Sequence, residues 1–178
     1  MSKKKIKVAV AMSGGIDSSV VTAILKDQGY DVCGVTMHVW PVGDFRESSS
    51  ISATAVKDAK KVAAQLGIEH HIINLSSQFA DKIVEPFCRE YLNGRTPNPC
   101  IHCNRLIKFA ELMHFAQSLQ ADYLATGHYV RVIHGSPCRL RKGVDQGKDQ
   151  SYFLSRLRQN QLERILTPLG EYRKDEVK

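Results

Sequence analysis

The start of the chain constrains the fold most, because it joins a strand to a helix through a glycine- and serine-rich turn. Residues 6–11 form an apolar run typical of a buried strand, and residues 20–25 have the apolar spacing of a helix. The turn between them has the sequence Ala11-Met12-Ser13-Gly14-Gly15-Ile16-Asp17-Ser18-Ser19. Adjacent glycines let the backbone approach a ligand closely, and the first amides of a helix lack intrahelical partners. The sequence therefore predicts a phosphate-binding loop.

This loop differs from two common nucleotide-binding loops. Kinases and GTPases require Gly-x-x-x-x-Gly-Lys-Ser/Thr, whereas no lysine follows Gly14 and Gly15, and the Gly-x-Gly-x-x-Gly of dinucleotide folds is missing too. Residues 13–18 instead resemble the Ser-Gly-Gly-x-Asp-Ser loop of the ATP pyrophosphatases, or PP-loop enzymes. The resemblance implies a loop that holds the β- and γ-phosphates of ATP. An oxygen of a second substrate then attacks the α-phosphate and pyrophosphate leaves. A turn that merely joins strand to helix is the alternative.

The bulk composition is that of a globular protein with a single domain. Of the 178 residues, 43% are hydrophobic and 24% are charged, which is enough apolar material for a core. No apolar run approaches the ~20 residues of a membrane span, and no signal-peptide core follows the first lysines. We therefore expect a soluble cytoplasmic protein without membrane contact. The formal charge of +7 suggests a polyanionic partner, and five cysteines, an odd number, argue against a disulfide framework.

Strand and helix patterns alternate along most of the chain. Strands are expected at residues 31–37, 69–75 and 122–126, and helices at 53–66, 79–91 (broken or kinked at Pro86) and 101–119. Repeated βα units imply a doubly wound parallel sheet of the α/β, Rossmann-like class. Ligands of such sheets bind at the carboxyl ends of the strands, where the opening loop, Met37 and Gly127 are expected to meet.

Three segments depart from this alternation. Residues 41–52 are expected to form a loop, and residues 129–144 are expected to form a hairpin added to the sheet, turning at Gly135-Ser136-Pro137. Residues 169–178 suggest a turn followed by the first turn of a helix, which the chain leaves too short to bury a face. We therefore expect a catalytic domain over residues 1–170, with 171–178 beginning a following, truncated segment.

A second candidate site surrounds Cys100 and Cys103. Prolines at 97 and 99 favour an extended approach to a helix start, and Arg95, Arg105 and Lys108 lie nearby in the sequence. A thiol in this setting is expected to ionise below its usual pKa of ~8.5. Three interpretations remain open from these residues alone: a sulfur-carrying nucleophile, a pair of metal ligands, or two partly buried residues at a helix start.

Four further blocks of sequence carry a closer resemblance. They are TPNPCIHCNRLIKF (96–109), ATGHY (125–129), KDQSYFL (148–154) and PLG (168–170). Together with the opening loop they resemble the tRNA-uridine 2-sulfurtransferases, the MnmA-type 2-thiouridylases, in the same order along the chain. That resemblance implies an α/β fold of the PP-loop class. It also implies ATP-dependent 2-thiolation of the wobble uridine, by adenylation of its 2-oxygen and sulfur transfer from a cysteine persulfide.

The resemblance also assigns roles to individual residues. It implies that Cys103 is catalytic and that Asp17 helps to place Mg²⁺. Residues facing the target base would be Asn98, Pro99 and Cys100, and residues contacting tRNA would be His128, Lys148, Asp149 and Gln150. The residues holding ATP would be Ala11, Met12, Ser13, Gly14, Gly15, Ile16, Asp17, Ser18, Met37 and Gly127.

The implied cofactors and partners are ATP with Mg²⁺, the anticodon stem-loop of tRNA and a persulfide donor protein. The family carries a second catalytic cysteine in a later block than any in this chain. An iron–sulfur cluster on Cys100, Cys103 and that later cysteine is a further implied possibility. Two alternative functions follow: a domain that binds ATP and tRNA without thiolation, and another PP-loop ligase or amidotransferase, which would have no use for Cys103.

Overall fold

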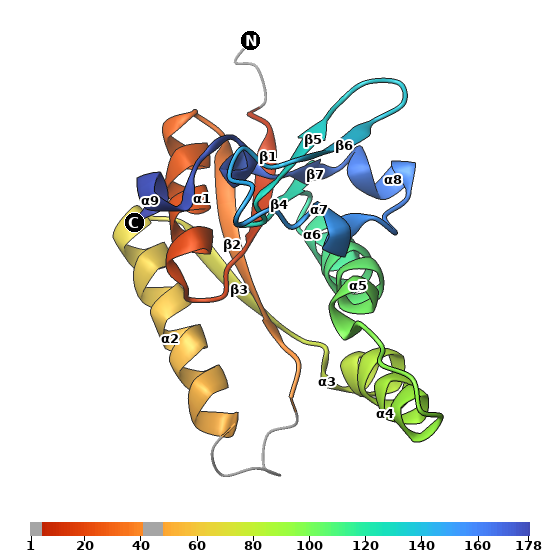
Figure 1. Cartoon of the computed structure of the whole chain (residues 1–178). Coiled ribbons are helices and arrows are strands. Elements are labelled where there is room, and N and C mark those ends of the chain that lie inside the picture. Colours follow the sequence, from red (N-terminus) through yellow and green to blue (C-terminus); the bar gives the residue numbers. More distant parts are fainter. Residues whose placement is uncertain (1–4, 41–47) are drawn as a thin grey trace.

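Five parallel strands form the central sheet of the computed structural model, which describes residues 5–40 and 48–178, with side chains from residue 54 in the second range (Figure 1). The strand order is β3-β2-β1-β4-β7. The strands are β1 Lys7–Ala11, β2 Asp31–His38, β3 Glu69–Asn74, β4 Tyr123–Ala125 and β7 Ile165–Leu166. The first four confirm the predicted strands. The fifth, β7, was not predicted, because two apolar residues show no periodicity.

Helices cover both faces of this sheet, so the predicted doubly wound architecture is confirmed. Helices α1 (Ile16–Asp27) and α2 (Ser48–Leu66) lie on one face, and η2 (Asn104–Glu111) and α6 (Leu112–Ser118) lie on the other (Figure 1). Side chains alternate along β1 accordingly. Val8 and Val10 pack in one buried cluster with Val21 of α1, whereas Ala9 packs in the other with Leu112 of α6.

The helical segment that contains Pro86 is continuous. It comprises α3 (Ser76–Phe79), a π-helical stretch η1 (Ala80–Val84) and α4 (Glu85–Leu92). Pro86 has no N–H to donate to the preceding turn, and the π-helical stretch immediately before it accommodates the missing hydrogen bond. The predicted disturbance at this proline is therefore a local widening of the helix and no break.

The long helix predicted over residues 101–119 is present but kinked. It is built of α5 (Pro99–Cys103), the π-helical η2, and α6, and Phe109 inside η2 has non-helical φ and ψ of −101° and 17°. Gln161 of α8 (Gln159–Leu162) donates from Nε2 to the carbonyl oxygens of Arg105 at 3.1 Å and Phe109 at 2.6 Å. A side chain that takes carbonyls out of the helical ladder is a recognised cause of a kink.

The predicted hairpin is also present. Strands β5 (Val130–Ile133) and β6 (Arg139–Lys142) pair antiparallel, with Val130 opposite Lys142. They form a two-stranded sheet of their own, so the expectation that the hairpin extends the central sheet is wrong. The hairpin instead packs on η3 (Pro168–Glu171), where a Cβ added to Gly170 would lie 2.1 Å from the carbonyl oxygen of Val130. Only glycine permits this approach of the two backbones.

The last helix, α9 (Lys174–Val177), is packed against the domain. Val177 is 5% exposed and belongs to the buried cluster shared by α1 and β1. The expectation that this turn could not bury a face is therefore wrong, because Val177 packs against core residues of α1 and β1.

The loop expected over residues 41–52 is described only in part. Of this segment, residues 41–47 lie outside the described residues, whereas 48–52 already belong to α2.

Within the described ranges, no helix combines the length and the apolar character needed to cross a membrane.

Candidate functional site

A cavity of about 490 Å³ opens at the carboxyl ends of β1, β2 and β4. This is the edge at which the sequence predicted a nucleotide site. The residues that line the cavity come from the opening loop, from the ends of three strands and the residues after them, from α2 and η2, and from position 150. They are Ala11, Met12, Ser13, Asp17, Ser18, Val35, Thr36, Met37, Val39, Trp40, Ala55, Lys108, Thr126, Gly127, His128 and Gln150.

The opening loop is held in shape by its own serines. The Ser18 hydroxyl donates to the carbonyl of Gly15 at 3.0 Å and accepts from the backbone N–H of Ser13 at 3.2 Å. Gly14 has φ of +76°, and a Cβ there would lie 2.4 Å from the carbonyl oxygen of Ala55 in α2. A side chain at this position would therefore be both strained and blocked.

Helix α1 begins next to this cavity with Gly15 as its N-cap, and no side chain caps its first turn. Because the first amides of a helix have no intrahelical acceptors, they favour an anion at this point. Ile16 in the same turn is 57% exposed. The loop thus combines a helix N-terminus, two serine hydroxyls and an exposed apolar side chain.

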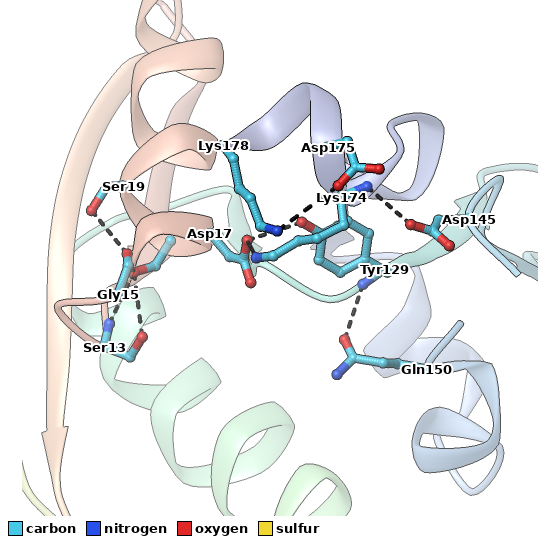
Figure 2. A network of polar contacts seen from close by, with 11 residues as sticks. Ser13, Gly15, Asp17, Ser19, Tyr129, Asp145, Gln150, Lys174, Asp175 and Lys178 are labelled. Carbon is cyan, nitrogen blue, oxygen red and sulfur yellow. Dashed lines mark hydrogen bonds and ion pairs between the residues drawn. The ribbon is translucent and has the colours of Figure 1, made fainter. Parts of the chain in front are cut away.

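Asp17 connects the loop to two distant segments (Figure 2). Its Oδ1 accepts from the Tyr129 hydroxyl at 2.9 Å and lies 2.5 Å from the ammonium Nζ of Lys174 on α9. Burial and the hydrogen bond to Asp17 raise the pKa of Tyr129, and the hydrogen bond to Asp17 raises the pKa of Lys174. Asp17 is the single acidic residue among the described residues that line the cavity. Mg²⁺ held by one carboxylate and by substrate phosphates suits this arrangement.

Lys108 and His128 add polar groups to the opposite wall. The His128 ring contacts that of Phe109 in a tilted arrangement, with ring centroids 5.9 Å apart, and its Nδ1 lies 2.8 Å from the Thr126 hydroxyl. Protein surrounds the ring closely, although part of it faces the cavity. Burial, with a smaller effect of the positive charge of Lys108, lowers the pKa of His128 to about 3. His128 is therefore neutral at physiological pH and can accept or donate one hydrogen bond.

Met12 and Met37 belong to the apolar lining of the cavity, together with Val35, Val39 and Trp40. The Thr36 hydroxyl donates to the Met12 carbonyl at 2.9 Å and fixes the end of β1 against β2. Met37 lies between two buried clusters, one under α6 and one containing Leu75 and Ile83. These thioethers next to polar loop groups suit a ligand with a flat apolar part and a charged part.

The two cysteines differ in environment. Cys100 is exposed, and its N–H donates to the Asn98 side chain at 3.1 Å, so Asn98 caps α5. Cys103 is partly buried against Leu75, Ile83 and Ile107, together with Met37 and Val39, and those last two residues also line the cavity.

Burial raises the pKa of the Cys103 thiol, although the charge of Lys108 opposes this. The expectation that this thiol ionises below its usual pKa is therefore wrong. Neighbouring positive charge in the sequence favours the thiolate, but removal of the sulfur from water outweighs it here.

The segment 148–150 divides between two roles. Gln150 lines the cavity and pairs twice with Tyr129, through Tyr129 N–H to Oε1 and Gln150 N–H to the Tyr129 carbonyl, both at 3.0 Å. Asp149 accepts from the N–H of Gly143 at 2.9 Å and from the hydroxyl of Ser151 at 2.7 Å. Burial opposes ionisation of Asp149, and these hydrogen bonds outweigh it, so its pKa is lowered. Asp149 fastens the hairpin to α7 (Ser151–Leu154), and Lys148 lies outside the cavity.

The structure thus brings together at the cavity Ala11, Met12, Ser13, Asp17, Ser18, Met37, Gly127, His128 and Gln150. Gly14, Gly15 and Ile16 shape the loop beside it, whereas Asn98, Pro99, Cys100 and Cys103 lie along α5. Sequence reasoning did not assign Lys108, Tyr129 or Lys174 to the site. The sequence could have indicated Lys108, because it lies five residues after Cys103. It could not have indicated Tyr129 and Lys174, because they reach Asp17 from 112 and 157 residues away.

A second cavity of about 400 Å³ lies on the other side of the kinked helix. Three arginines line it, Arg105, Arg158 and Arg164, together with His114, Gln117, Asn160 and Gln161 and an apolar floor of Leu106, Phe109, Ala110 and Met113. Among the described residues that line it, none is acidic. This cavity was not predicted, since its arginines come from two separate segments.

No group of three or more histidine, cysteine or acidic side chains in the described part of the chain is placed to hold a metal ion. The cysteines at 33, 88, 100, 103 and 138 are all free. Iron–sulfur clusters are held by four thiolates as a rule, so Cys100 and Cys103 do not make such a site by themselves.

Comparison with known proteins agrees with the fold and the motifs. Residues 6–178 match the family model described as tRNA methyl transferase HUP domain. A tRNA-specific 2-thiouridylase MnmA of Syntrophotalea carbinolica is 51% identical over 100% of this chain and 50% of its own length. The tRNA-specific 2-thiouridylase MnmA 1 of Caldanaerobacter subterraneus subsp. tengcongensis is 54% identical over 97% of this chain and 49% of its own length. The chain therefore spans about half the length of the curated relatives it matches.

One solved structure supports the fold alone. It is the crystal structure of a predicted subunit of tRNA methyltransferase from Methanocaldococcus jannaschii, which is 20% identical, with a TM-score of 0.57 over 97% of this chain and 72% of that one. The family model covers almost the whole chain, and the two relatives carry the name of the 2-thiouridylases, the family that the motifs predicted. This chain belongs to the tRNA methyl transferase HUP domain family, and its motif resemblance to the 2-thiouridylases is confirmed.

Proposed function

We propose that this chain is the ATP-dependent activating domain of a tRNA-uridine 2-sulfurtransferase. The observation that carries the proposal is the 490 Å³ cavity, where a serine-lined helix N-terminus meets Lys108, His128 and Gln150. Met37 and Val39, on the wall of that cavity, also pack in the cluster that includes Cys103. The arrangement can hold a nucleoside triphosphate, and it places a thiol near the nucleotide.

In the proposed first step, the loop amides and the hydroxyls of Ser13 and Ser18 bind the phosphates of ATP. Mg²⁺ on Asp17 would neutralise charge that develops on the phosphates. The 2-oxygen of the wobble uridine attacks the α-phosphorus and N3 of the uridine gives up its proton to solvent. The bond to the bridging oxygen breaks, and pyrophosphate leaves with the electron pair. Lys108 stabilises the negative charge on the α-phosphate, in a site partly closed to water.

In the second step, a persulfide sulfur attacks C2 of the adenylated uridine and AMP leaves with the former 2-oxygen. Cys103 would release that sulfur by forming a disulfide with the cysteine that carried it. Because burial raises the pKa of Cys103, this step requires a base that takes the proton of its thiol. Asn98, Pro99 and Cys100 would face the target base, and His128, Lys148, Asp149 and Gln150 would contact the tRNA.

The proposed partners follow from this chemistry. The tRNA anticodon stem-loop supplies the uridine, a persulfide donor protein supplies the sulfur, and the chain itself would act in the cytoplasm. The catalytic domain, expected over residues 1–170, would include α9 as well, because Val177 packs in its core and Lys174 pairs with Asp17.

A second candidate function is ATP and tRNA binding without thiolation. It is favoured by the length of the match, which covers about half of the curated relatives, and by the burial that raises the pKa of the Cys103 thiol. An amide-forming ligase of the PP-loop class is less well supported, because it would use neither Cys103 nor the segment 148–150.

Pyrophosphate release from ATP in the presence of unmodified tRNA tests the proposal. The chain should release pyrophosphate only when tRNA with an unmodified wobble uridine is present, and Cys103→Ser should leave that step intact. A longer version that includes the following segment should form 2-thiouridine, and the Cys103→Ser variant of it should form none. Pyrophosphate release that does not depend on tRNA would reject the activating role of the chain. A normal amount of 2-thiouridine formed by the longer Cys103→Ser variant would reject the catalytic role of Cys103.

A further inference from the structure

Trp40 is the most exposed large apolar residue among the described residues that line the nucleotide cavity. It is 46% exposed, whereas Met12 and Val35 in the same cavity are 2% and 0% exposed. An aromatic surface of this size that is left open to water often marks a place where a ligand or a partner binds. Trp40 is also the single tryptophan of the chain. Its ring is therefore a candidate contact for a flat ligand that enters the cavity.

The position of the Trp40 ring is fixed from α3. Strand β2 ends at His38, and the His38 carbonyl accepts from the backbone N–H of Leu75 at 2.7 Å. Helix α3 starts directly after Leu75 and ends at Phe79. The Phe79 ring meets that of Trp40 edge to face, with centroids 5.4 Å apart and an interplanar angle of 67°. This contact orients the indole and still leaves part of its surface free.

Phe79 also connects Trp40 to the cysteine that the proposed reaction uses. Phe79 and Cys103 pack against the same buried cluster, which includes Ile83. The segment that begins with α3 continues into η1, and η1 contacts α5, which ends at Cys103 (Figure 1). Trp40 therefore lies on the Cys103 side of the nucleotide cavity.

The proposed reaction requires a nucleobase on this side. Enzymes that modify a base take it out of its stack and hold it against aromatic or apolar side chains. The uracil has to present its 2-oxygen to the α-phosphorus and later its C2 to the persulfide. Stacking on an indole contacts the face of the base and leaves the atoms at its edge, including the 2-oxygen, free to react. It also replaces part of the stacking that the base gave up in the anticodon loop.

We propose that Trp40 is the residue on which the wobble uracil stacks when it enters the cavity, and that Phe79 holds the indole in position for it. The proposal rests on the proposed function, because it takes the uridine of tRNA as the second substrate. It adds a base-binding residue that comes from the end of β2 and thus from a segment other than α5.

Binding of two RNA hairpins to the whole chain tests this role. One is an anticodon stem-loop with an unmodified wobble uridine, and the other has an abasic nucleotide at that position, so that both present the same phosphates. α,β-Methylene-ATP fills the nucleotide site without releasing pyrophosphate. The hairpin with uracil should quench the fluorescence of Trp40, whereas the abasic hairpin should leave it nearly unchanged.

Variants of Trp40 turn this into a measurement of affinity, read from the anisotropy of a dye on each hairpin. Trp40→Leu should bind the uracil hairpin about 5- to 100-fold more weakly, as expected for the loss of one stacked base. It should bind the abasic hairpin, and adenosine, as the wild type does. Trp40→Phe keeps an aromatic face and should recover most of the lost affinity.

Tyr91→Leu is the matched control. Tyr91 on α4 is 53% exposed and pairs with another aromatic ring, that of Phe87, with centroids 4.9 Å apart. It is not among the described residues that line the cavity. This variant loses an exposed aromatic ring as Trp40→Leu does, and it should bind both hairpins normally.

Each outcome decides one point. If Trp40→Leu still prefers the uracil hairpin as strongly as the wild type does, the assignment of Trp40 is overturned and the proposed function stands. An equal loss of affinity for both hairpins would make Trp40 a structural part of the cavity wall, and would also overturn it. Weaker binding of adenosine with an unchanged preference for uracil would assign the indole to the adenine ring instead. A wild type that does not prefer uracil would overturn the proposed function itself.

Discussion

His128 illustrates how burial at the cavity changes the chemistry of a single residue. Its pKa is lowered from 6.5 to about 3, chiefly by loss of water around the ring. In the unfolded chain the same histidine takes up a proton near pH 6.5. Between these two values the unfolded state therefore binds more protons than the folded state. Stability must fall as the pH falls through that window.

Replacement of this histidine should remove part of the acid sensitivity. Lowering the pH from 7 to 4.5 should cost the wild type about 2–3 kcal/mol more unfolding free energy than it costs His128→Asn. Urea unfolding at the two pH values measures this difference, and the effects of Asp145 and Asp149 cancel because both proteins contain them. An identical pH dependence for the two proteins would contradict the burial of the ring.

Cys103 offers a second test at the level of one residue. Its raised pKa predicts slow alkylation by iodoacetamide at pH 7, with a rate that rises to a midpoint above the ~8.5 of a free thiol. A variant with Cys88→Ser and Cys100→Ser removes the two exposed thiols, so mass spectrometry can follow Cys103. The same variant unfolded in urea should give the ordinary midpoint. A midpoint below 8.5 in the folded protein would restore the expectation from sequence that nearby positive charge lowers this pKa.

At the level of elements, the kink in the helix that carries Cys103 depends on Gln161. Its amide donates to two carbonyls of η2, and without it these partly buried acceptors would lose this partner. Gln161→Ala should therefore lower the unfolding free energy by about 1–3 kcal/mol. Urea unfolding should show this loss, whereas Gln117→Ala, at an exposed position on α6, should change stability by less than about 0.5 kcal/mol. Equal stability of Gln161→Ala and wild type would mean that the kink is intrinsic to η2.

These elements also show what a sequence can predict and what it cannot. The strand at residues 7–11 and helix α1 followed from local periodicity, because each buries a continuous apolar face. The kink at Phe109 could not be predicted, since its cause lies on α8, more than 50 residues later. Likewise β7 is too short to carry a pattern, and pairing with β4 alone identifies it as a strand.

At the level of the whole molecule, the candidate site depends on contacts between distant segments. The motifs predicted which loop would bind phosphate and which edge of the sheet would hold it, because both follow from local chemistry and from the βα order. The pairing of Asp17 with Tyr129 and Lys174 could not be predicted, as it requires the hairpin and α9 to be docked. The raised pKa of Cys103 was missed for the same reason, since burial is a property of the folded chain.

The second cavity gathers three arginines of this basic chain, whose formal net charge is +7. Arg105 lies on the same helical segment as Cys103, two residues further on, while Arg158 and Arg164 flank α8 on the other wall. A cavity with three guanidinium groups and no acidic side chain among its described lining residues suits the phosphates of an RNA backbone. A strand held there would run beside the helix that carries the proposed base-facing residues.

Phosphate contacts of this kind predict a specific dependence on salt. Each Arg→Ala change at 105, 158 or 164 should weaken tRNA binding and reduce the slope of log affinity against log salt concentration by about 1, because one fewer counterion is released. Filter binding of unmodified tRNA across a KCl series measures both quantities. Lys61→Ala removes one charge from α2 on the opposite face of the sheet, and its slope should stay that of the wild type. If the arginine variants keep the wild-type slope while Lys61→Ala lowers it, the tRNA backbone runs over α2. The target base would then lie on the α2 side of the nucleotide cavity.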